Sequence, residues 1–165
     1  MSERIGMGYD VHRVAAGRPL VLGGVRLESP WGLEGHSDAD VIAHAVGDAL
    51  LGAAALGDLG EHFPTSDPRW KDISSLKLLE HIAGLLAGRG FRIGNVDATL
   101  LADAPRIAPH REAMQAALAG ALRVPEDSVS VKATTNEGLG FVGRREGLAA
   151  LAIARILKES SQGAR

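Results

Sequence analysis

Residues 38–55 read DADVIAHAVGDALLGAAA, and this stretch decides the fold. Its apolar residues recur with helical spacing, and Ser37 followed three residues later by Asp40 is typical of a capping box. The pattern therefore predicts a helix over Asp38–Ala55. The segments on either side indicate what this helix packs against.

Strand and helix patterns alternate outward from this helix. The predicted strands are Arg4–His12, Phe91–Ala102 and Val129–Thr134, with a hairpin over Pro19–Leu27; the further helices are 74–89 and 109–122; the loops are 31–37, 57–71 and 136–146. Glu146–Leu157 is ambiguous, because its alanine content favours a helix while its apolar character on every face is typical of a buried strand. The whole predicts one domain over residues 1–165, of the α/β or α+β class, with helices packed on one face of a mixed sheet.

Composition excludes several classes of protein. The chain has 165 residues, a net charge of -2 and no long run of Lys or Arg, which argues against nucleic acid as a partner. It has no cysteine, so a metal would have to be held by His, Asp or Glu. We see no signal peptide, transit segment or membrane-spanning run, and expect a cytoplasmic protein or the mature form of an imported one.

A first candidate metal-binding pattern is Asp10-Val11-His12. Residues two apart in a strand point to the same face, so Asp10 and His12 would converge while Val11 enters the core. Carboxylate and imidazole are ligands that suit zinc. The competing interpretation is a turn carboxylate beside a surface histidine.

A second candidate is His44, which lies in an apolar stretch of the predicted helix. Asp40, His44 and Asp48 are four residues apart and share a helix face, so a core histidine hydrogen-bonded to either carboxylate explains the pattern equally well. Together with the strand pair, the pattern favours a site made of Asp10, His12 and His44. Three protein ligands leave one position open, as in catalytic zinc sites.

A third dense segment, residues 132–144, leaves a strand and enters a glycine-rich loop. Its backbone N–H groups and threonine hydroxyls can hold phosphate oxygens, Arg144 can grip a phosphate, and Glu137 can bind a cation such as Mg²⁺ or Mn²⁺. A hairpin loop with solvated charges is the alternative. Residues 58–60 and 63–68 can bind a polyol or simply form turns, and residues 104–109 can cup a base or simply lead into a helix.

Taken together, these segments resemble the cyclodiphosphate synthases of the non-mevalonate isoprenoid pathway. The matching pieces, in chain order, are Gly8–His12, His36–Asp40 with His44, Asp48–Asp58, Phe63-Pro64, Gly94–Asp97, Lys132–Thr135, Gly140-Phe141, Gly143-Arg144 and Glu146-Gly147. Thr65 departs from the pattern, because related sequences can carry an aspartate there.

The resemblance implies a role for each matched residue. Asp10, His12 and His44 would hold one zinc ion per subunit, and Glu137 would hold a second divalent cation, Mg²⁺ or Mn²⁺. His36 and Thr135 would steady the phosphoryl transition state. The substrate-binding residues would be Ser37, Asp58, Gly60, Phe63, Pro64, Thr65, Ser66, Asp67, Phe141 and Arg144. The cytidine-binding residues would be Ala102, Pro105, Arg106, Ile107, Ala108, Ala133, Thr134 and Thr135.

The resemblance also implies an assembly and a reaction. The family forms a homotrimer whose subunit sheets meet at the trimer axis, with active sites between subunits, an isoprenoid-like ligand on the axis and a strand as its last segment. The expected reaction converts a cytidine-diphosphate-linked methylerythritol phosphate to a cyclic diphosphate and releases CMP. Two rivals stay open: a zinc phosphoester hydrolase, and a nucleotide-binding trimer with a structural zinc.

Overall fold

The computed structural model describes residues 2–158. Its strands are β1 (Ser2–Ala16), β2 (Leu20–Leu22), β3 (Val25–Leu27), β4 (Trp31–Leu33), β5 (Phe91–Leu101), β6 (Val129–Thr134) and β7 (Gly147–Lys158). Its α-helices are α1 (Val41–Ala54), α2 (Leu59–His62), α3 (Ser75–Gly88), α4 (Arg111–Leu122) and α5 (Gly140–Gly143), and single 3₁₀ turns span Pro68–Trp70, Ala108–His110 and Glu126–Ser128.

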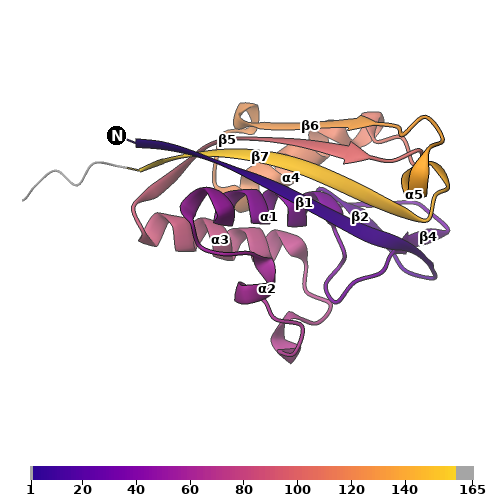
Figure 1. Cartoon of the computed structure of the whole chain (residues 1–165), viewed down its shortest axis with the longest axis horizontal. Coiled ribbons are helices and arrows are strands. Elements are labelled where there is room, and N and C mark those ends of the chain that lie inside the picture. The colour runs from indigo at the N-terminus through magenta and orange to yellow at the C-terminus, as the bar shows by residue number, and fades with distance from the viewer. Residues whose placement is uncertain (1, 159–165) are drawn as a thin grey trace, which may run out of the picture.

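Five strands form one mixed sheet in the order β4-β1-β7-β5-β6, and β2 pairs with β3 in a separate hairpin. Only β5 and β6 run parallel within the described sheet, and the helix α4 connects them. Helices α1 and α3 lie along one side of the sheet, and the long strands β1 and β7 run beside each other (Figure 1). The α+β class, the mixed sheet and the helices on one face are therefore as predicted.

The close contact between α1 and the sheet depends on small residues. Gly6 and Gly8 of β1 pair in register with Ala154 and Ala152 of β7. A Cβ atom built on Gly8 would lie 1.9 Å from the backbone oxygen of Ala45 in α1. These strand positions are therefore small because the helix backbone occupies the space of a side chain.

The N-terminus of α1 differs from the predicted capping box. Asp40, not Ser37, is the N-cap, and its carboxylate accepts hydrogen bonds from the N–H groups of Ile42 and Ala43. The same carboxylate accepts from Gly23 and Gly24 in the β2–β3 turn, at 2.9 and 2.6 Å. The helix begins at Val41 because Asp40 joins it to that turn, a contact that the local sequence does not reveal.

Several other elements were located correctly, and some were missed. The strands β5 and β6, the hairpin and the helices α3 and α4 match their predictions closely. The ambiguous segment is the strand β7, as the resemblance implied. The predicted loops contain the short elements β4, α2 and α5, which are too brief to give a periodic pattern.

The prediction that Val11 enters the core is wrong. Its side chain is on the sheet face opposite the helices and is 44% exposed, and that face carries further large apolar residues. We call this set the apolar sheet face: Ile5, Met7, Tyr9, Val11, Leu151 and Ile153. The core lies on the other face, so the strand alternation was correct but the two faces were assigned wrongly.

Candidate metal centre

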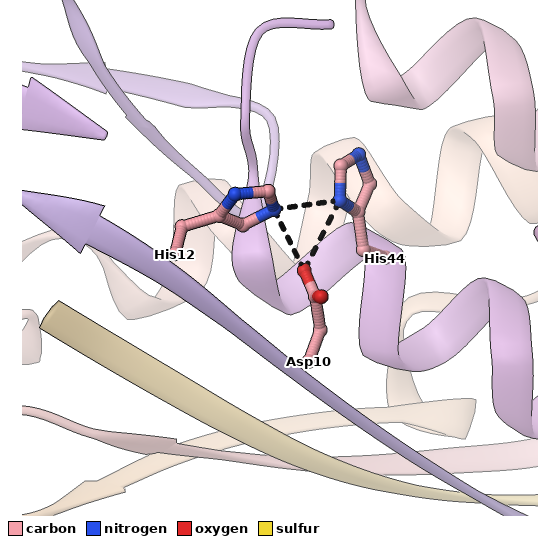
Figure 2. A group of neighbouring side chains, drawn as sticks. All are labelled: Asp10, His12 and His44. Atoms are coloured by element: carbon pink, nitrogen blue, oxygen red, sulfur yellow. Dashed lines mark hydrogen bonds and ion pairs between the residues drawn. The ribbon is translucent and has the colours of Figure 1, made fainter. Parts of the chain in front are cut away.

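Asp10, His12 and His44 come together between the sheet and α1 (Figure 2). The Oδ2 atom of Asp10 lies 2.9 Å from Nε2 of His12 and 3.1 Å from Nδ1 of His44, and the two nitrogens are 3.0 Å apart. Two ligands come from alternate positions of β1 and one from the facing turn of α1. The strand-plus-helix arrangement predicted from the sequence is what the structure contains.

The remaining nitrogen of each histidine has its own partner. His12 donates from Nδ1 to the backbone oxygen of Glu34 at 2.7 Å, which leaves Nε2 with a lone pair. On His44, Nε2 lies 2.9 Å from the hydroxyl of Ser75 and 3.0 Å from that of Ser37. Such partners typically fix the orientation of metal-binding imidazoles.

This arrangement fits a divalent cation. When His12 and His44 donate from their outer nitrogens, three acceptor atoms face one another, and this is unfavourable unless a positive charge lies between them. Zinc–ligand distances near 2.0 Å would place tetrahedral donors about 3.3 Å apart, close to the observed triangle. The donor set of one carboxylate and two imidazoles suits zinc and leaves one position open.

Without a cation, an imidazole that carries a proton on the nitrogen facing Asp10 donates to that carboxylate instead, and this changes the pKa values of the site. Burial acts to raise the pKa of Asp10, but hydrogen bonds and charge from His12 and His44 outweigh it and lower the pKa to about 2. Burial acts to lower the pKa of His12, but the hydrogen bond and charge of Asp10 outweigh it, so the net pKa is raised. The carboxylate is therefore ionised and ready to bind a cation at neutral pH.

The three ligands open into a pocket of about 240 Å³. Five predicted site residues line it with them: His36, Ser37, Gly60, Phe63 and Thr65. Four lining residues were not assigned to the site by sequence reasoning: Asp48, Leu59, Trp70 and Leu78. Asp48 shares the helix face of His44 as predicted, but its carboxylate accepts from the N–H of Leu59 at 2.9 Å and burial raises its pKa.

The rest of the expected polyol loop does not line this pocket. Asp58 is the N-cap of α2, and Asp67 caps the 3₁₀ turn at Pro68–Trp70 while pairing with Arg69 at 2.6 Å. Pro64 and Ser66 are exposed. The alternative that these residues form turns accounts for the contacts of Asp58 and Asp67 in this chain.

The eight predicted cytidine-binding residues line one second pocket of about 320 Å³, together with Asp103 and Arg111. Asp103 was missed by sequence reasoning, and it changes one prediction. Its carboxylate accepts from the N–H groups of Asn136 and Gly138, at 2.9 and 3.2 Å, so these donors do not face an outside phosphate. The expectation that backbone N–H groups of this loop hold phosphate is wrong at these two positions.

The remaining predicted residues lie away from the metal-centre pocket. Glu137 accepts a hydrogen bond of 3.1 Å from Thr135, which belongs to the second pocket. Arg144 pairs with Glu146 at 3.0 Å, and Phe141 lines a third pocket, of about 270 Å³, which touches the metal-centre pocket at His12. Within residues 2–158 of one chain, the expected active-site residues are therefore divided between separate surfaces.

The fold and the site define a two-layer α+β protein with a candidate metal site of three ligands. The chain belongs to the YgbB family, whose model matches residues 3–157. A 2-C-methyl-D-erythritol 2,4-cyclodiphosphate synthase of Alkaliphilus oremlandii is 56% identical over 94% of this chain and 99% of the relative. The structure titled "IspF (Plasmodium falciparum) CDP complex" has a TM-score of 0.85 and 30% identity, over 96% of this chain and 98% of that one.

Another relative is longer than this chain. The "Bifunctional enzyme IspD/IspF" of Anaeromyxobacter dehalogenans is 63% identical over 93% of this chain, but the match covers only 39% of that relative. The chain therefore spans about two fifths of the bifunctional relative's length. Among the described residues, none of the helices is both long and apolar enough to cross a membrane.

Proposed function

We propose that this chain converts 4-diphosphocytidyl-2-C-methyl-D-erythritol 2-phosphate to 2-C-methyl-D-erythritol 2,4-cyclodiphosphate and releases CMP. The observation that carries the proposal is the triangle of Asp10, His12 and His44, whose three side chains line one pocket. Family membership and the names of the full-length relatives support it. The enzyme would be a phosphorus–oxygen lyase of non-mevalonate isoprenoid biosynthesis.

The triangle would hold zinc, and Glu137 would hold a second cation, Mg²⁺ or Mn²⁺. Bound there, the two cations would act as Lewis acids that draw charge from phosphate oxygens. His36 and Ser37 line the same pocket, so they would donate hydrogen bonds to the diphosphate. The apolar side chains of Phe63 and Leu59 would cover the methylerythritol carbons.

In the proposed step, an oxygen of the 2-phosphate attacks the diphosphate phosphorus nearer the sugar alcohol. A phosphorus–oxygen bond forms there, and the bond from that phosphorus to the bridging oxygen of the cytidylate breaks. That oxygen leaves with its electron pair as part of CMP. The attacking phosphate is already ionised, so no general base is required, and the enzyme's task is to hold two anions in contact.

We propose that neighbouring subunits complete the active site. The metal-centre pocket and the cytidine pocket have no lining residue in common within the described chain. One nucleotide-linked substrate could occupy both only if the cytidine pocket of one copy faced the metal centre of another. Thr135 and Glu137 would then approach the diphosphate from the second copy.

The apolar sheet face supports a trimer built around an axis. A contiguous apolar surface of this kind is rarely left in water. We propose that three such sheets meet there and enclose an isoprenoid-like ligand beside Arg144 and Glu146. The absence of cysteine agrees with a cytoplasmic location, which is part of the proposal.

Phosphorus NMR of the product tests the reaction. The purified chain, loaded with zinc and Mg²⁺, should convert the synthetic substrate to a cyclic diphosphate and CMP. Release of inorganic phosphate or a linear product would instead identify a hydrolase. Binding of CDP without turnover would identify a nucleotide-binding protein and refute the cyclase.

Mixing two inactive variants tests the shared site. His44→Ala damages the metal centre, and Thr135→Ala damages the second pocket. If the site lies between copies, each site takes His44 from one copy and Thr135 from its neighbour. In trimers refolded from an equimolar mixture, about a quarter of the sites should then have both residues intact, and activity should return to about a quarter of that of the unmodified protein. Activity no higher than that of the separate variants would show that each copy works alone.

A further inference from the structure

The outer nitrogen of His44 is enclosed by two buried hydroxyl groups. Ser75, the first residue of α3, lies 2.9 Å from Nε2, and Ser37 lies 3.0 Å from it. Their exposed fractions are 1% and 7%. Ser37 lies 7 residues before His44 in the chain and Ser75 lies 31 residues after it, so the local sequence around His44 does not predict both contacts.

Asp38 fixes the direction of the Ser75 hydroxyl. Its Oδ1 atom accepts a short hydrogen bond from that hydroxyl, and its Oδ2 atom accepts from the backbone N–H of Ser75 at 2.9 Å. A carboxylate can only accept, so the single hydroxyl proton of Ser75 points to Asp38. The Ser75 oxygen must then accept from Nε2–H of His44.

These hydrogen bonds determine which nitrogen of His44 carries the proton and which carries the lone pair. With Nε2 carrying the proton, Nδ1 presents its lone pair toward Asp10 and His12. Nδ1 is the atom that completes the ligand triangle. The chain Asp38–Ser75–His44 therefore selects the tautomer in which His44 can bind a cation.

Ser37 is held differently. Its hydroxyl accepts from the N–H of Ala39 at 3.2 Å, and within residues 2–158 no carboxylate receives its proton. It also lines the metal-centre pocket. Ser37 can therefore turn toward a substrate phosphate while Ser75 keeps the imidazole in place.

We propose that Asp38 and Ser75 are positioning residues that fix the tautomer and ring orientation of His44 and so strengthen metal binding. The inference rests on the metal-binding part of the proposed function, and it holds whichever phosphoryl transfer follows. Partners of this kind typically change metal affinity by about 10–100-fold when they are removed.

Zinc affinity, measured by competition with a chromophoric chelator, tests the inference without any turnover. Ser75→Ala should bind zinc at least about tenfold more weakly than the unmodified chain. Ser75→Thr keeps the hydroxyl and should restore affinity. Ser74→Ala is the matched control, because Ser74 is the neighbouring N-cap of α3 and its side chain makes no capping hydrogen bond.

A double-mutant cycle separates this role from helix capping. Asp38→Ala should weaken zinc binding in the normal chain but add little in the Ser75→Ala background, because both changes break one chain of hydrogen bonds. In the zinc-loaded protein, the Nε2–H signal of His44 in ¹⁵N NMR should exchange faster with water after Ser75→Ala. A purely structural role would change melting temperature without these effects.

The inference is overturned if Ser75→Ala binds zinc within about twofold of Ser74→Ala, a difference far below the expected range. If Ser75→Ala does not fold, Asp38→Asn decides, because it keeps the size of the side chain but no longer offers two acceptor oxygens. Normal zinc affinity in that variant would also overturn the inference. Tight zinc binding without cyclic product would refute the proposed function and leave this inference standing.

Discussion

Replacing Gly8 with alanine should damage the fold and the metal centre together. The added Cβ would lie 1.9 Å from the backbone oxygen of Ala45 and 2.7 Å from the backbone nitrogen of Ala49. Backbone atoms cannot rotate away, so α1 has to retreat from β1 by about 1.5 Å to restore ordinary van der Waals contact. That displacement moves His44 away from Asp10 and His12.

The loss of stability expected for Gly8→Ala follows from the type of contact. Overpacking typically costs 1–3 kcal/mol, and we expect about 3 kcal/mol here because the obstacle is a helix backbone. For a domain of this size, the melting temperature should fall by about 10 °C. Zinc affinity should fall by about 100-fold, since ligand distances have to match to within roughly 0.2 Å.

Calorimetry and a zinc competition assay measure the two effects. Gly84→Ala in α3 is the control, because a Cβ there would meet no heavy atom within 4 Å beyond the neighbouring backbone of its own helix. Alanine in a helix interior should raise stability by about 0.5–1 kcal/mol and leave zinc binding unchanged. A Gly8→Ala protein with unchanged melting temperature and zinc affinity would refute the reasoning.

Four further predictions follow from the site and the sheet. His44→Ala should lose zinc, measured by elemental analysis, while its circular dichroism spectrum stays that of a folded chain. In the metal-free protein, the lowered pKa of Asp10 means that its ionised form stabilises the fold above about pH 4, and this stabilisation is lost as the pH falls through about 2. Asp10→Asn should therefore lower the free energy of unfolding in urea by about 2 kcal/mol at pH 6 and hardly change it at pH 2. Asp103→Ala leaves two loop N–H groups without their partner and should weaken CDP binding about tenfold by calorimetric titration, with partial recovery in Asp103→Asn. Met7→Lys should convert the proposed trimer to monomers in light scattering without unfolding them, and a trimer that survived this change would contradict the proposed use of the apolar sheet face.

The ligand triangle was predictable because its evidence is local. Asp10 and His12 are two residues apart in a strand, and His44 is conspicuous as a lone imidazole in an apolar helix. The contribution of Ser75 was not predictable, because a serine at the start of a helix is common and because its partner Asp38 lies 37 residues away in the chain. The role of Asp103 was also not predicted, because its hydrogen-bond partners lie 33 and 35 residues away in the chain.

The error over Val11 has a physical cause. Alternate residues of β1 are apolar, and an apolar strand face is normally the buried one. In this chain the face that covers α1 is instead built from Gly6 and Gly8, which have no hydrophobic side chain to reveal it. Hydropathy alone therefore pointed to the wrong side of the strand.

The alternation along β1 also has an evolutionary consequence. Odd positions from Ile5 to Val11 face away from the helices, and even positions from Gly6 to His12 face α1 and the candidate metal site. Substitutions at odd positions can therefore alter the proposed contacts between subunits while the metal ligands stay in place. An insertion or deletion of one residue before Asp10 would turn the side chains of each face of the strand to the opposite face. We therefore expect β1 to tolerate substitutions far better than any change in its length.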